Sequence, residues 1–147
     1  MLEALSNPRN RTLTFVFLAI CCASATVAII VGISDNPPGI FLAFGAATAF
    51  VLAFVHPWRT AKKFRLLLYA SVLSFVILGI LHNVFEGVAS TIEGAGALQI
   101  LLQGLGVTAF LIAVLICPPA VLVGVVGSIV MFIRNRRRPT QGTDTVS

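Results

Sequence analysis

Long apolar runs alternate with short polar or basic stretches along this chain of 147 residues. The apolar runs cover residues 12–33, about 40–56, about 65–86 and 98–133. An α-helix rises about 1.5 Å per residue, so roughly 20 residues cross a hydrocarbon core of about 30 Å. The pattern predicts an all-α integral membrane protein whose spanning segments form a four-helix bundle.

The last apolar run is the hardest to divide into spans. It contains 36 residues, too many for one straight span and barely enough for two. A single crossing keeps the basic tail at 134–138 on the same side as the other basic clusters, so we place the fourth span at 107–133. The long segment is expected to kink at Pro118-Pro119, where two residues lack a backbone N–H. Residues 97–106 then either lie at the membrane interface or lengthen the helix.

The connecting segments carry strong turn signals. Residues 34–39, with two prolines and a glycine, predict a tight hairpin, and the small and polar residues 87–96 predict a second loop. Residues 1–11 are expected to form a short cytoplasmic N-terminus, and residues 134–147 are expected to form a basic, disordered cytoplasmic tail. An alternative for the first run is a cleaved signal peptide, with small residues at 23–25 as the cleavage site.

The basic residues indicate how the chain is oriented. All ten lie in three clusters beside apolar runs, and they give a net charge of +5. Their positions are Arg9 and Arg11; Arg59, Lys62, Lys63 and Arg65; and Arg134, Arg136, Arg137 and Arg138. The positive-inside rule places all three clusters in the cytoplasm, so both termini are inside, and the plasma (cytoplasmic) membrane is the expected location.

The same charges limit the partners. They flank spans instead of following one amphipathic face, and the chain is 58% hydrophobic with a mean hydropathy of +1.02, so nucleic-acid binding is not expected. The cluster Arg59, Lys62, Lys63 and Arg65 is expected to contact anionic lipid headgroups at the cytoplasmic face, or a partner protein.

Small residues recur at four-residue spacing in three of the spans. They are Ser24, Ala28 and Gly32; Gly45, Ala49 and Ala53; and Ala120, Gly124 and Ser128. Such stripes let helix backbones approach closely. They predict a packed bundle, and they also suit contacts with other membrane subunits or self-association.

The third run carries the candidate functional patch, His82, Asn83 and Glu86. His82 lies 16 residues beyond Leu66, or roughly 24 Å along a helix, and therefore near the outer boundary. It cannot share one haem with His56, which lies at the inner boundary. His82 and Glu86 are spaced for contact on one helix face, where the carboxylate would stabilise a protonated imidazole.

That face is expected to point into the bundle. Its members are Ser71, Phe75, Gly79, His82 and Glu86, because successive spacings of three and four residues return to nearly the same side. An ionised carboxylate facing lipid would be unfavourable by about 2 to 3 kcal/mol at the bilayer centre and less near the interface.

Other chemistry is not indicated. Cys21, Cys22 and Cys117 lie inside apolar runs without metal-ligand spacing, so we interpret them as small buried hydrophobes. His82 and Glu86 supply only two ligands, so no metal site is expected. The sequence carries no phosphate-binding loop, GxSxG or HExxH, so no catalytic residue or cofactor is predicted, and any cofactor-binding residue is unknown.

The leading hypothesis is a small, non-enzymatic, multi-pass membrane protein that serves as an accessory or assembly subunit of a larger membrane complex. A first alternative is a small oligomeric transporter or proton-coupled carrier that uses His82 and Glu86. A weaker alternative is a redox subunit that contacts haem or quinone through His82.

Overall fold

The computed structural model describes residues 7–33, 36–92, 94 and 96–136, and its regular elements are helices. The helices are α2 (Pro8–Val31), α3 (Pro37–Val55), α4 (Ala61–Thr91), α5 (Ala97–Leu111), the π-helical stretch η1 (Ile112–Ile116) and α6 (Cys117–Arg136). Asp35, Glu93 and the tail beyond Arg136 lie outside the described residues.

Local chemistry explains where the first two helices begin and end. The side chain of Asn7 accepts a hydrogen bond of 3.1 Å from the backbone N–H of Arg9, and Pro8 occupies the first turn of α2. α2 ends at Gly32, whose φ of +87° suits a residue without Cβ. The Asn36 side chain then donates to the carbonyl of Val31, and α3 starts directly with Pro37 and Pro38.

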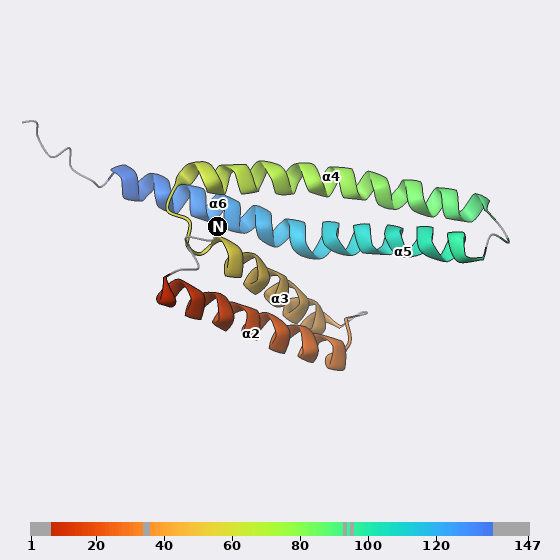
Figure 1. The fold of residues 1–147 in the computed structure, drawn as a ribbon, viewed down its shortest axis with the longest axis horizontal. Coiled ribbons are helices and arrows are strands. Elements are labelled where there is room, and N and C mark those ends of the chain that lie inside the picture. Colours follow the sequence, from red (N-terminus) through yellow and green to blue (C-terminus); the bar gives the residue numbers. More distant parts are fainter. Residues whose placement is uncertain (1–6, 34–35, 93, 95, 137–147) are drawn as a thin grey trace, which may run out of the picture.

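The helices pack in two hairpins. α2 packs against α3, and α4 packs against α5 and α6 along its length (Figure 1). α3 joins the two hairpins through contacts with η1 and α6, whereas α2 contacts α3 alone among the described elements. The start of α2, the start of α4 and the end of α6 lie at one end of the molecule (Figure 1). We call this the basic end, since it carries the described residues of the basic clusters, and the opposite end the far end.

α3 lies at the centre of this arrangement and supplies more buried residues than any other described helix. Its buried positions are Gly39, Ala43, Ala46, Ala47, Ala49, Val51, Ala53 and Val55. A Cβ atom at Gly39 would overlap the backbone carbonyl oxygen of Gly32, so only glycine permits this approach between α2 and α3. Of the expected small-residue stripe in α3, Ala49 and Ala53 are buried, but Gly45 is exposed, and a Cβ added there would meet nothing within 4 Å.

The last apolar run is one continuous helical segment. Residues 97–111 are helical and lead directly into η1 and α6, so that Ala97–Arg136 spans 40 residues. In η1 the backbone N–H of Cys117 bonds to the carbonyl of Ile112, five residues earlier. The π-helical stretch lies just before Pro118 and Pro119, which cannot donate to the carbonyls of the preceding turn.

The helices differ greatly in length. At about 1.5 Å per residue, the 19 residues of α3 extend about 28 Å, whereas the 31 residues of α4 extend about 46 Å. α4 and α5 therefore continue past the ends of α2 and α3 at the far end (Figure 1). This extension places the polar patch of α4 beside α5 alone.

Candidate functional site

His82 connects α4 to α5. Its Nδ1 atom lies 3.1 Å from the backbone carbonyl oxygen of Gly106, and its ring lies 5.0 Å from the ring of Phe110, centroid to centroid. A carbonyl oxygen can only accept, so we assign the proton to Nδ1. The backbone of Gly106 lies close to α4, and a Cβ added there would meet His82 and Phe85 at ordinary van der Waals distances.

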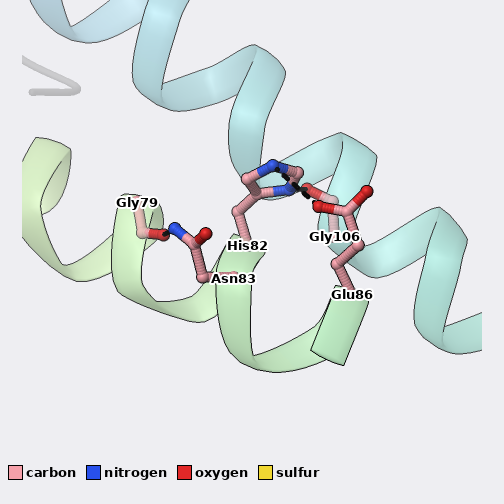
Figure 2. A network of polar contacts seen from close by, with 5 residues as sticks. All are labelled: Gly79, His82, Asn83, Glu86 and Gly106. Carbon is pink, nitrogen blue, oxygen red and sulfur yellow. Dashed lines mark hydrogen bonds and ion pairs between the residues drawn. The ribbon is translucent and has the colours of Figure 1, made fainter. Parts of the chain in front are cut away.

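Glu86 lies on the other side of the imidazole. Its Oε2 atom is 3.4 Å from Nε2 of His82, as expected for residues four apart on one helix (Figure 2). The two side chains differ in exposure, at 23% for His82 and 70% for Glu86. The imidazole is thus held against α5, whereas the carboxylate reaches into the surroundings.

Asn83, the third member of the predicted patch, takes no part in this contact. Its amide donates a hydrogen bond of 2.8 Å to the carbonyl of Gly79 on its own helix (Figure 2). Asn83 is exposed. The structure therefore brings together His82 and Glu86 of the predicted patch and separates Asn83 from them.

A polar cleft of about 410 Å³ opens between α4 and α5 at this point. Its lining residues are His82, Glu86, Ser90, Gln103, Gly106 and Val107. Gln103, Gly106 and Phe110 were not predicted as site residues from the sequence. The available signal was Gln99 and Gln103, two amides at four-residue spacing inside an apolar run, which a helix presents on one face.

The expected inward face of α4 is only partly inward. Ser71 is buried and donates to the backbone carbonyl of Leu67, but Phe75 is 47% exposed and Glu86 is exposed. Fifteen residues separate Ser71 from Glu86, and at about 100° per residue this leaves them about 60° apart around the helix. Glu86 therefore points further away from α5 and α6 than Ser71 does.

His56 lies near the basic end, away from the cleft. Its Nδ1 is 3.2 Å from the carbonyl of Ala53, its ring packs near that of Phe17, and its Nε2 is buried without a hydrogen-bond partner among the described atoms. The two histidines therefore have similar Nδ1 contacts but different Nε2 surroundings.

The described basic residues are all exposed and lie at the basic end, namely Arg9, Arg11, Arg59, Lys62, Lys63, Arg65, Arg134 and Arg136. A groove of about 620 Å³ on α4 is lined by Lys62, Lys63, Arg65, Leu66 and Tyr69. Nearby, Trp58 packs edge-on against the buried Phe64, with ring centroids 5.6 Å apart. The structure thus places cations directly beside apolar helix surface.

The cysteines are free, and only Cys117 is fully buried; Cys21 is partly buried and Cys22 is exposed. Within the described part of the chain, His, Cys, Asp and Glu side chains form no group of three or more that could hold a metal ion. The prediction that Cys22 is buried was wrong: α2 contacts α3 with only one of its faces, and Cys22 is exposed.

The fold defines an integral membrane protein, with four helices each long and apolar enough to cross a bilayer. Comparison of the chain with protein-family models, curated proteins and solved structures finds no match.

Proposed function

We propose that the protein is a non-enzymatic accessory or assembly subunit that docks onto a second membrane protein through the far ends of α4 and α5. The docking element is the far-end hairpin, which we define as residues 86–91 of α4 and 97–105 of α5. The observation that carries the proposal is that this hairpin exposes apolar side chains beyond the length of helix that a bilayer covers.

The placement follows from the basic cluster at the start of α4. Lys62, Lys63 and Arg65 belong at headgroup level, so the hydrocarbon core begins at about Leu66. Twenty residues at about 1.5 Å each then bring the helix to about Phe85. Gly106 of α5 packs against Phe85 and His82, so the residues before Gly106 lie at the level of 86–91 or beyond.

The apolar side chains of this hairpin are open. Leu98, Ile100, Leu101 and Leu105 are 49%, 71%, 59% and 44% exposed. Burying apolar area contributes about 25 cal/mol per Å², so leaving several such side chains outside hydrocarbon is costly. Tilting could absorb a long helix, but α3 is only about as long as the core is thick and belongs to the same packed unit. A protein partner would cover them.

The groove within the apolar region favours the accessory-subunit function over the alternative of a transporter. One groove of about 320 Å³ lies between α2, α3 and η1, and its lining residues are Cys21, Ala25, Ala28, Ile29, Ile33, Ala43, Ala46, Ala47, Phe50, Leu115 and Ile116. The described hydroxyls at this depth bond to backbone carbonyls, for example Thr26 to Cys22 and Thr48 to Phe44. Such surfaces suit lipid chains or a partner helix, not the passage of a polar substrate.

The test is site-specific photocrosslinking in the native membrane. A photoreactive residue at Ile100, 71% exposed on the far-end hairpin, is expected to give one discrete protein adduct. The matched control is Ile29 on α2, which is 75% exposed at membrane depth and is expected to react with lipid. Adducts at Ile100 with lipid alone, or only with a second copy of this chain, would contradict the accessory role.

A further inference from the structure

We propose that His82 and Glu86 form a binding site for a divalent cation of the zinc type, open toward the cleft between α4 and α5. This inference goes beyond the docking function: it shares Glu86 with the far-end hairpin, but it is argued from the geometry of the two side chains and the cleft. The sequence analysis expected no metal because it could count only two ligands. The structure adds three observations: the tautomer of His82, the distance between Nε2 and Oε2, and the cleft through which a cation could reach the two side chains.

The tautomer of His82 suits metal binding. Nδ1–H donates to the carbonyl of Gly106, so in the neutral ring the lone pair is on Nε2, the atom that faces Glu86. Metal-binding histidines commonly donate their other ring N–H to a backbone carbonyl, which fixes the ring orientation. Without a proton or a cation between them, the Nε2 lone pair and the carboxylate would repel each other.

The distance between Nε2 of His82 and Oε2 of Glu86 bears on whether a proton or a metal cation lies between them. Nε2 and Oε2 are 3.4 Å apart, whereas a charge-assisted N–H···O hydrogen bond is typically about 2.7 to 2.9 Å. In a tetrahedral zinc site, bonds of about 2.0 to 2.2 Å place neighbouring ligand atoms about 3.4 Å apart. The separation of the pair is therefore compatible with a tetrahedral ion between the two atoms.

The surroundings leave room for the ion and its other ligands. Glu86 is 70% exposed, and the cleft of about 410 Å³ also presents the side chains of Ser90 and Gln103. No Lys or Arg is among the lining residues of this cleft. His82 lies about 24 Å along α4 from Leu66, roughly 6 Å inside the far boundary of the hydrocarbon core, and Glu86 lies at that boundary, so a cation would reach the imidazole from the far-end aqueous phase past Glu86 and through the cleft. Water or the Gln103 amide oxygen would complete the coordination.

The experiment uses the metal-free, full-length protein in a mild detergent, titrated with Zn²⁺ by calorimetry. We expect one ion per chain, with affinity lowered at least about tenfold in both His82→Ala and Glu86→Gln. The matched control is His56→Phe, which removes the other histidine and should leave the affinity unchanged. Binding should weaken as the pH falls, because protons compete for the Nε2 lone pair.

Titration with Co²⁺ separates this site from the cysteines. Coordination by nitrogen and oxygen gives visible bands without a thiolate charge-transfer band. Unchanged affinity in both variants, or a thiolate band that accounts for the bound ion, would overturn the proposal. If His82→Ala fails to fold by circular dichroism, Glu86→Gln carries the test, because its exposed side chain makes no contact that holds α4 to α5. A Glu86→Gln variant with full Zn²⁺ affinity would equally overturn it.

Discussion

The Nδ1 atom of His82 on α4 lies 3.1 Å from the carbonyl oxygen of Gly106 on α5, and no other side-chain hydrogen bond joins these two helices among the described residues. Elsewhere the described hydroxyls of α4 and α5 bond to their own helices, as Ser90 does to Gly87 and Thr108 to Gly104. The contact between these helices at the far end thus depends on one polar side chain and on apolar packing.

Replacement of His82 by alanine should destabilise the protein measurably. It removes a hydrogen bond that contributes about 0.5 to 1.5 kcal/mol and the packing of the ring on Phe110. We expect the free energy of unfolding to fall by about 1 to 2 kcal/mol, measured by reversible unfolding in mixed micelles. Asn83→Ala is the control, since Asn83 is exposed and bonds only within α4. Equal stability of the two variants would mean that His82 does not hold α5.

A methyl group at Gly39 should separate α2 from α3. The added Cβ would overlap the backbone oxygen of Gly32, and backbone cannot move aside as a flexible side chain can. Overpacking of this kind typically costs about 1 to 3 kcal/mol, so Gly39→Ala should clearly lower the melting temperature in detergent. Gly45→Ala makes the same chemical change where nothing lies within 4 Å and should leave the melting temperature nearly unchanged. Similar losses in both variants would contradict the close approach as the cause, because helix propensity by itself favours alanine over glycine.

Local signals in the sequence account for much of the fold but not for the site. The hairpin before Pro37 and the apolar runs are local features, so the sequence could predict the helices of α2 and α3. Apart from Pro118-Pro119, no turn signal interrupts residues 98–133, so the sequence left residues 97–106 open between an interfacial segment and a helix extension. The pairing of His82 with Gly106 depends on the register of α4 against α5 and α6, which is set by distant contacts such as Leu68 against Gly124. The four-residue spacing could predict that His82 contacts Glu86, but it could not predict that α5 packs against His82.

The groove beside Tyr69 should make the protein sensitive to anionic lipid. Lys62 and Arg65 are exposed there beside apolar surface, and each basic residue near an anionic membrane contributes about 1 kcal/mol. We expect phosphatidylglycerol to raise the melting temperature of the wild-type protein, and the rise to shrink in a Lys62→Gln, Arg65→Gln variant. The control variant, Arg9→Gln with Arg11→Gln, makes the same charge change on α2 at the same end. Equal lipid effects in both variants would show general attraction of the basic end instead of a site on α4.

The basic end should face the cytoplasm, because lysine and arginine are strongly retained on that side of a membrane. The structure offers positions at both ends for a labelling test, in a background where Cys21, Cys22 and Cys117 are replaced by alanine. A cysteine at Ser90, exposed at the far end of the chain alone, should react with a membrane-impermeant maleimide on intact cells that produce the chain in excess of any docking partner. A cysteine at Lys63, exposed at the basic end, should react only after the membrane is opened. Labelling of both positions on intact cells would show that the chain inserts in two orientations, and labelling of Lys63→Cys alone would reverse the orientation. Either result would also move the cleft of His82 and Glu86 away from the outer aqueous phase in some or all of the molecules.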